Sequence, residues 1–251
     1  TASGQVLEDG GFLKPLGALQ IGRATDRARL DAFLAAFEES GIALKEIDPR
    51  TAIPGLREDW VLGVEEPTCA YIDVAGLHAA CLGTTRRAGA QIVTRAALQA
   101  AHWQDGQWQL TTAAGAFAAS ILVNAAGAWA DEVAKICSVR PLGITPYRRT
   151  LVQLRTEPGA PEGLPHVASL DSSFYFKPEP GGRIWLSPHD ETPDVAHDVA
   201  PEELDVAIAI DRFEHVVDWR VAAVERKWAG LRSFAPDRKP VYGFAKEQPG
   251  Y

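Results

Sequence analysis

The spacing of apolar residues along the chain predicts an early helix between short strands. Leu30, Leu34 and Phe37 share one helical face with Phe33, and Thr25 or Asp26 precedes them as an N-cap. Gly41 follows where the helix is expected to end, because glycine adopts the left-handed conformation of a C-terminal cap. Turn-rich apolar segments on either side predict strands within residues 11–22, 42–47 and 61–65.

A second helix is predicted from Asp73 to Ala88, with Gly89 at its end. Asp105-Gly106 predicts a hairpin, because Asp-Gly favours the tight turn between antiparallel strands. Apolar residues run without a break towards Val123, which is typical of a strand buried on both faces. The strands expected in this part are 91–94, 97–103, 108–112 and 117–123, and a short helix follows at 129–137.

The rest of the chain is predicted to be rich in strands. Residues 140–155 are long and extended, and 174–177 and 183–187 flank a Pro-Gly-Gly turn. Pro201 predicts the start of a helix that runs to Trp219. Further strands are expected at 221–234 and 241–244. The fold class is therefore α/β with α+β character: a partial βα layer joined to an antiparallel-sheet region.

Composition narrows the class of protein. The 251 residues are 46% hydrophobic and carry a net charge of −8, which describes a soluble globular chain and argues against binding to nucleic acid. No apolar run reaches the ~18 residues of a membrane span. The three cysteines and six histidines show no metal-ligand spacing, so we expect no metal site, free thiols and a cytoplasmic location. The absence of Met indicates part of a longer polypeptide, and the excess of Arg over Lys with a single Asn indicates GC-rich bacterial coding.

Two segments could form a ligand site. The strand expected up to Val123 opens onto Ala125-Ala126-Gly127, where small side chains allow a ligand to approach the backbone; an ordinary strand–turn–helix joint is the alternative. Arg232 lies in an apolar strand beside Leu231, and a guanidinium there needs a partner. An internal carboxylate, the commoner case, or the carboxylate of a ligand could supply it.

Further polar residues allow a functional and a plain structural interpretation. Tyr175 points away from the face of Phe174 and Phe176, so its hydroxyl could bind a ligand or its ring could be half-buried. Arg148 and Arg149 are adjacent in a strand, so at most one of them is expected to enter a site. The acidic loop at 189–191 is expected to be solvated, and no nucleophile elbow or Walker-type loop supports a hydrolase.

Together these segments resemble the FAD-dependent D-amino-acid oxidase/dehydrogenase superfamily, which includes glycine and sarcosine oxidases. The resemblance spans nearly the whole chain and is carried by residues 71–78, 121–131, 140–143 and 228–232, with the Pro-Asp turn that follows. More narrowly, residues 169–178 and 196–205 look like D-arginine dehydrogenase-type enzymes.

The resemblance implies a flavoprotein with a small-molecule amino-acid substrate. It places residues 71–139 in part of the FAD-binding region, 140–226 in the substrate-binding region, 227–251 back toward the FAD-binding region, and 1–70 interleaved between the two. Arg232 matches the arginine that holds the substrate carboxylate. Tyr175 and Arg149, or Arg148 in its place, match further carboxylate contacts. The positions that match contacts of FAD are Ala97, Ala125, Ala126, Gly127 and Trp129.

The implied reaction is hydride transfer from the Cα–H of a D-amino acid or a related amino acid to the flavin, giving an imine and then a 2-oxo acid. The electron acceptor stays open, so oxidase and dehydrogenase are both possible. The family's Gly-x-Gly-x-x-Gly phosphate loop and its final glycine-rich segment are absent from the printed chain, which therefore resembles a family member truncated at both ends. The alternative is a non-catalytic fragment that holds no flavin; a nicotinamide-dependent dehydrogenase is a third, weaker interpretation.

Overall fold

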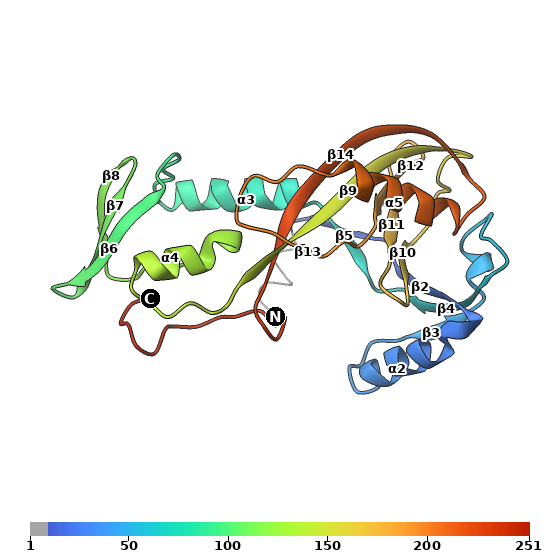
Figure 1. Ribbon diagram of the computed structural model, residues 1–251, viewed down its shortest axis with the longest axis horizontal. Coiled ribbons are helices and arrows are strands. Elements are labelled where there is room, and N and C mark those ends of the chain that lie inside the picture. Colours follow the sequence, from blue (N-terminus) through green and yellow to red (C-terminus); the bar gives the residue numbers. More distant parts are fainter. Residues whose placement is uncertain (1–9) are drawn as a thin grey trace. The chain divides into compact units, whose positions relative to one another are not determined.

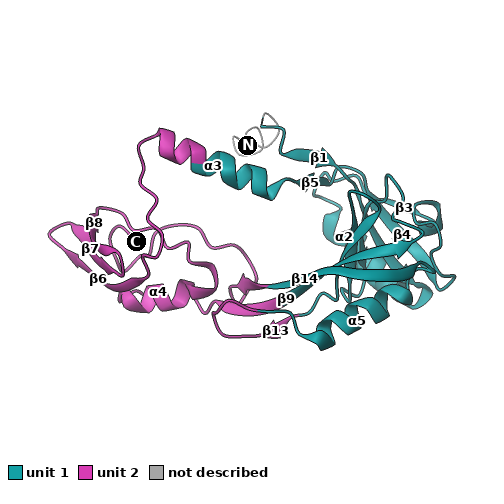
Figure 2. Cartoon of the chain, turned by 90° about the horizontal axis from the view of Figure 1, so that it is seen from above, with its two compact units in different colours: residues 1–82, 149–190, 200–229 teal, residues 83–148, 191–199, 230–251 magenta. Residues whose placement is uncertain are grey.

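The computed structural model describes residues 10–251, which divide into two compact units (Figures 1 and 2). Unit 1, teal in Figure 2, comprises 10–82, 149–190 and 200–229 of the described residues. Unit 2, magenta, comprises 83–148, 191–199 and 230–251. Mixed sheets with a few helices make up the chain, which confirms the predicted α/β class with α+β character.

Most of unit 1 is a mixed sheet with the strand order β9-β12-β11-β10-β2-β4-β3. Neighbouring strands are antiparallel, except for the parallel pair β10 and β2. Strand β14 (Arg220–Phe234) also pairs with β9, and β1 (Leu13–Pro15) and β5 (Ala70–Ile72) form a separate ribbon. The other bounds are β2 Ala18–Arg23, β3 Lys45–Ile47, β4 Trp60–Glu66, β9 Thr145–Glu157, β10 His166–Ser169, β11 Tyr175–Glu179 and β12 Arg183–Ser187.

One face of this sheet is buried against helix α5 (Glu203–Glu214). Phe176 and Phe213 are fully buried and meet edge to face at 5.3 Å, and Phe174 lies in the same cluster. Alternate residues of a strand point to opposite faces, so Tyr175 lies on the other face, as predicted. The predicted early helix is also confirmed: α2 (Arg27–Phe37) buries Leu30 against β4.

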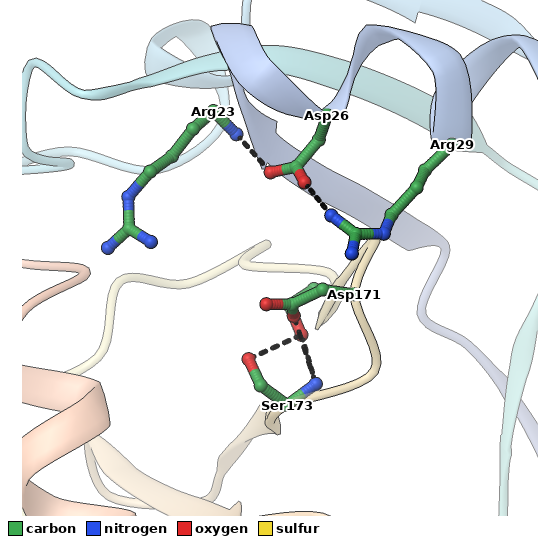
Figure 3. A network of polar contacts seen from close by, with 6 residues as sticks. Arg23, Asp26, Arg29, Asp171 and Ser173 are labelled. Atoms are coloured by element: carbon green, nitrogen blue, oxygen red, sulfur yellow. Dashed lines mark hydrogen bonds and ion pairs between the residues drawn. The ribbon is translucent and has the colours of Figure 1, made fainter.

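Two sets of polar contacts lie at the end of β2 and in the loop that precedes β11 (Figure 3). Asp26 accepts a 2.9 Å bond from the Arg23 backbone N–H and pairs with Arg29. Asp171 accepts a 3.0 Å bond from the backbone N–H of Ser173. Burial raises the pKa of Asp171, but hydrogen bonds from Ser173 and Ser169 and the charge of Arg29 outweigh burial and hold that pKa below its usual range.

Unit 2 contains a three-stranded antiparallel sheet and a short helix. The predicted hairpin is confirmed, since Asp105 (φ 51°) and Gly106 (φ 78°) both adopt the left-handed conformation that its turn requires. Buried Trp108 packs with Ala134 and Cys137 in a small core. The elements are β6 Leu98–Gln104, β7 Gln107–Thr112, β8 Gly115–Ala119, α4 Ala130–Ile136 and β13 Thr192–Pro193.

Helix α3 (Val74–Arg87) confirms the second predicted helix, and Gly89 (φ 83°) follows its end. None of its residues is buried, and Val74 is 68% exposed. Helix α5 is shorter than predicted: it begins at Glu203 rather than Pro201 and ends at Glu214. Within residues 10–251, no helix has the length and hydropathy to cross a membrane.

Several predicted strands are wrong or too long. Residues 91–94 and 241–244 form no strand, the strand predicted at 117–123 ends at Ala119, and the one at 42–47 shrinks to β3. Extended backbone needs a neighbouring strand to satisfy its N–H and C=O groups, and the described residues place none beside these segments. Their apolar side chains are therefore exposed: Ile92 39%, Val93 44%, Ile121 53%, Val123 77%, Val241 54% and Phe244 69%.

Candidate functional site

The small-residue turn that follows residue 123 is held in place by Asn124. Its amide group donates to the carbonyl of Ala130 at 2.8 Å and to the hydroxyl of Tyr251 at 2.7 Å. Its side-chain oxygen accepts from the backbone N–H of Ala126 at 3.2 Å. These three bonds hold the Asn124 side chain against the inner side of the turn. The outer surface of the turn is therefore not covered by Asn124.

That outer surface is open and built from small residues. Gly127 has φ 56°, and a Cβ placed there would meet no atom within 4 Å. Ala125 is exposed and Trp129 is 43% exposed. Ala97, just before β6, is exposed too, and its carbonyl accepts from Ala113 at 3.0 Å. The backbone of the turn at Ala125 and Gly127 is therefore open to the approach of a ligand.

Asp131, at the start of α4, ties this region of unit 2 to the loop before β9. Its carboxylate accepts from the backbone N–H groups of Leu142, Gly143 and Ile144 at 2.9–3.0 Å. Gly143 (φ 80°) in turn lies so close to Pro236 that an added Cβ would be 3.2 Å from the proline ring. The turn after β14, which follows Arg232, is thereby packed against the loop that Asp131 holds.

The guanidinium of Arg232 lies 5.7 Å from the ring of Phe234. Within residues 10–251 it makes no ion pair with a carboxylate, so the internal partner judged commoner for this arginine is not found. Its neighbour Arg238 does have one, because Glu191 binds the Arg238 guanidinium with bonds of 2.5 and 3.1 Å. Both guanidinium groups are exposed and lie beside the ring of Phe234, and among the described residues only that of Arg238 pairs with a carboxylate.

The two adjacent arginines of β9 have different surroundings. Arg148 lies 3.9 Å from the carboxylate of Asp194, and its side chain is 11% exposed. Arg149 is buried and donates through Nε to the carbonyl of Asp190 at 2.9 Å. The Asp190 carboxylate accepts from the N–H and hydroxyl of Thr150 at 2.8 and 2.9 Å. Both arginines are therefore anchored by neighbouring protein groups.

Tyr175 is half-buried on the open face of the sheet in unit 1. Its ring contacts two imidazoles, and the ring centroids of His166 and His189 each lie 5.5 Å from that of Tyr175. Nothing in its own segment of the sequence marks His166 as a candidate site residue. Only the pairing of β10 with β11 brings its ring against Tyr175.

Beside His166 lies a cavity of about 700 Å³, which the sequence analysis did not identify. Lys177 and Trp185 are direct partners across β11 and β12, and the Lys177 ammonium lies 4.0 Å from the Trp185 ring and 4.2 Å from the Tyr71 ring. The only signal was the alternation that puts Lys177 on the same face as Tyr175. The lining residues are 16–18, 69–75, 78, 166, 177 and 185.

Burial shifts the pKa of two side chains that line this cavity, His166 and Tyr71. It lowers the pKa of His166, with a further contribution from the charge of Lys177, so the imidazole is neutral at neutral pH. Burial also raises the pKa of Tyr71, with help from Glu179 and Asp73. Among residues 10–251, no group of three His, Cys, Asp or Glu side chains is arranged to hold a metal ion.

The predicted site residues thus fall into both units. Tyr175 and Arg149 belong to unit 1, where the cavity also lies. Arg148 and Arg232 belong to unit 2. The predicted cofactor contacts are all in unit 2: Ala97, Ala125, Ala126, Gly127 and Trp129.

Comparison with known proteins identifies relatives of this chain. A family model described as FAD dependent oxidoreductase matches residues 5–251. Hydrogen cyanide synthase subunit HcnC of Pseudomonas aeruginosa is 28% identical over 142 residues, 56% of this chain and 33% of the relative. Human mitochondrial dimethylglycine dehydrogenase is 30% identical over 193 residues, 73% of this chain and 22% of the relative. The matched segments therefore cover a third or less of the length of these relatives.

Solved structures share the fold. Glycine oxidase from Geobacillus kaustophilus superposes with a TM-score of 0.83 at 21% identity, covering 99% of this chain and 69% of that one. L-proline dehydrogenase from P. horikoshii gives a TM-score of 0.84 at 20% identity, covering 99% and 68%. At this level of identity the likeness establishes the fold alone.

Proposed function

Because this chain belongs to the family of FAD-dependent oxidoreductases, we propose that it forms the substrate-binding part, and a share of the flavin-binding part, of an enzyme that oxidises amino acids. The observation that carries the proposal is Arg232, whose exposed guanidinium pairs with no carboxylate in the part of the chain that the structure describes. A guanidinium binds a carboxylate through two parallel N–H···O bonds, and every amino acid supplies that carboxylate.

The substrate class is a D-amino acid or a related amino acid. Arg232 binds its carboxylate, and the Tyr175 hydroxyl with one of Arg149 and Arg148 supplies the remaining contacts. Fixing the carboxylate orients the Cα–H bond toward the acceptor, which lowers the entropic part of the barrier. The names of the relatives support this class, since they refer to glycine, proline and dimethylglycine.

The cofactor is FAD, which accepts a hydride from Cα when it is bound. The substrate loses that hydride and a proton from its nitrogen to become an imine, and water hydrolyses the imine to a 2-oxo acid. The residues that hold the cofactor in this proposal are Ala97, Ala125, Ala126, Gly127 and Trp129, and the backbone at Ala125 and Gly127 is open to the approach of a ligand. The chain's own contribution is binding and orientation, which matches the lack of a nucleophile in its motifs.

An absorption spectrum of the purified chain with and without added FAD tests the cofactor part. Flavin bound by the chain gives bands near ~370 and ~450 nm that remain with the protein after gel filtration. Gly127→Val should weaken that binding, since the added side chain enters the open surface. If the bands of the unaltered chain elute with free FAD, the alternative holds: the chain is a folded fragment that binds no flavin by itself.

Arg232→Ala tests the substrate part in the flavin-loaded protein. Amino acids should reduce the flavin anaerobically, and Arg232→Ala should raise the KM by roughly 100-fold or more, because a paired charge is lost. Arg232→Lys should restore part of the affinity. Arg226→Ala is the matched control, since Arg226 is an exposed arginine of the same strand. Equal KM values for the Arg232 and Arg226 variants would remove Arg232 from the site.

A further inference from the structure

A smaller cavity of unit 1, of about 290 Å³, lies between the end of β2 and the last turn of α5. Phe174, which belongs to the buried cluster beneath α5, forms part of its wall, whereas Tyr175 lies on the other face of the sheet. This cavity shares no lining residue with the cavity of about 700 Å³. The residues that line it are Arg23, Trp60, Ser173, Phe174, Asp211, Arg212 and His215.

Arg23 supplies the first positive charge of this cavity. Its guanidinium carbon lies 4.6 Å from the centre of the Trp60 ring, and among residues 10–251 its guanidinium donates to no acceptor. The carboxylate of Asp26 accepts from the backbone N–H of Arg23 and pairs with Arg29, while the Arg23 side chain points away from it (Figure 3). The N–H bonds of a guanidinium lie in its own plane, so contact with a ring face leaves them available to a ligand.

Arg212 supplies the second positive charge, and the backbone holds it in place. Its Nη1 donates to the carbonyl of Ser173, before β11, and to that of Pro188, after β12, the latter at 2.6 Å. Both acceptors are neutral, so they fix the guanidinium without compensating its charge. In the part of the chain that the structure describes, Nε and Nη2 of Arg212 make no hydrogen bond and no carboxylate pairs with the side chain.

The acidic residue of the lining does not balance the two arginines. The Asp211 side chain is 72% exposed, so water and salt screen its charge, and it lies 3.7 Å from Nδ1 of His215. The same Nδ1 donates to the Asp211 carbonyl at 2.7 Å. Asp171 lies outside the lining and accepts from the backbone N–H of Ser173. The wall of the cavity therefore carries two positioned cations that no described carboxylate pairs with.

We propose that this cavity binds a phosphate group, either free or carried by a small molecule. Arg23 and Arg212 belong to different elements, β2 and α5, so their donors reach a ligand from two directions. The tetrahedral oxygens of a phosphate can accept from both guanidinium groups at once, whereas a single guanidinium already satisfies the two coplanar oxygens of a carboxylate. The inference goes beyond the proposed function and does not rest on it.

Calorimetric titration of the full chain tests the site, at constant ionic strength so that screening is the same for every anion. Inorganic phosphate should bind saturably with a Kd of about 1 mM or tighter, and acetate at least ~10-fold more weakly. Phenyl phosphate distinguishes the two sources: its binding supports a phosphate ester as ligand, and its exclusion restricts the site to free phosphate. No saturable binding of phosphate, or equally tight binding of acetate, would overturn the inference.

Variants separate this site from other positive charges of the chain. Arg23→Gln removes a guanidinium that makes no hydrogen bond among the described residues, and it should weaken phosphate binding about 10-fold or more. Arg226→Gln makes the same charge change on an exposed arginine of β14 and should leave the affinity unchanged. Arg212→Lys keeps the charge but loses the planar fork, so it should also weaken binding. Equal affinities for the Arg23 and Arg226 variants would contradict the site.

The indole N–H of Trp60 reports on the same site in the unaltered chain. It donates to the carbonyl of His215 at 3.0 Å, and the Trp60 ring contacts the Arg23 guanidinium. Its ¹H–¹⁵N signal, identified among the seven tryptophans by its loss in Trp60→Phe, should shift with phosphate along the calorimetric binding curve. The signal of Trp108, in the core of unit 2, should stay fixed. A stationary Trp60 signal while the heat saturates would place the anion elsewhere and refute the inference.

Discussion

The two units bury their apolar residues to very different degrees. Unit 1 buries a cluster that joins the sheet to α5 and includes Phe174, Phe176, Phe213 and Trp219. Unit 2 has a core of four buried residues around Trp108, while Ile121 and Val123 are more than half exposed. Both units contain apolar segments whose sequence is typical of strands. The difference in burial lies in whether the described residues supply a neighbouring strand for each of these segments. A hydrophobic run specifies a strand only where a partner strand is present.

The largest effect is expected in the core of unit 1. Phe213→Ala should lower the free energy of unfolding of that unit by ~3–5 kcal/mol, because Phe213 is fully buried between Phe176 and Trp219. Val123→Ala in unit 2 should change stability by less than ~0.5 kcal/mol, since that side chain is 77% exposed. Urea unfolding followed by circular dichroism measures both. Similar losses for the two variants would erase the contrast between the units.

Hydrogen exchange should resolve the same contrast along the backbone. The amide of Phe176 lies within the ladders of β11, whereas residues 91–94 and 121 and 123 lie outside every strand of the described residues. The Phe176 amide should therefore exchange roughly 1,000-fold more slowly than that of Val123. Mass spectrometry or NMR reports the rates, and comparable protection at the two positions would mean that unit 2 acquires a strand partner in solution.

A smaller effect is expected in the core of unit 2. The Trp108 indole donates to the carbonyl of Gly250 at 3.0 Å, and its ring contacts Trp103 and Tyr251. Trp108→Phe should cost about 0.5–1.5 kcal/mol, because the Gly250 carbonyl loses one of its two donors and keeps the backbone N–H of Leu122. Tyr242→Phe is the control, since Tyr242 is 91% exposed. Retention of full thermal stability by Trp108→Phe would show that this core contributes little to folding.

The smallest effect is a pH dependence in unit 1. The pKa of Asp171 is lowered in the folded state, so its stabilising contribution is present above the ordinary value of 3.8 and is lost as pH falls through the lower folded value. The gain is less than about 1 kcal/mol, because the side chain is partly exposed. Asp171→Asn should lack this part of the acid-induced fall in Tm. Parallel Tm curves below pH ~5 for the variant and the unaltered chain would contradict it.

Several elements could be predicted because their cause is local. Asp105-Gly106 specifies its turn through backbone conformation, and the spacing around Leu30 specifies the face of α2. The alternation around Tyr175 correctly assigned that side chain to the open face. The strand predicted through Val123 failed because its hydrogen-bond partners are not local, and the pattern alone does not reveal whether they are present.

The residues of the candidate site also divide into those that sequence could identify and those that only packing revealed. Sequence alone singled out Arg232 and Tyr175, since a cation and a hydroxyl stand out in apolar strands. It could not decide that Arg238 pairs with Glu191 while Arg232 pairs with no carboxylate among residues 10–251, because the Arg238–Glu191 pair joins residues 47 positions apart. Nor could it show that Lys177 lies between Trp185 and Tyr71. The periodicity of a helix and the conformation of a turn depend on residues that are neighbours in sequence, so the sequence alone determines them. The register of strands and the pairing of charges join distant segments, so they are decided only when the chain packs.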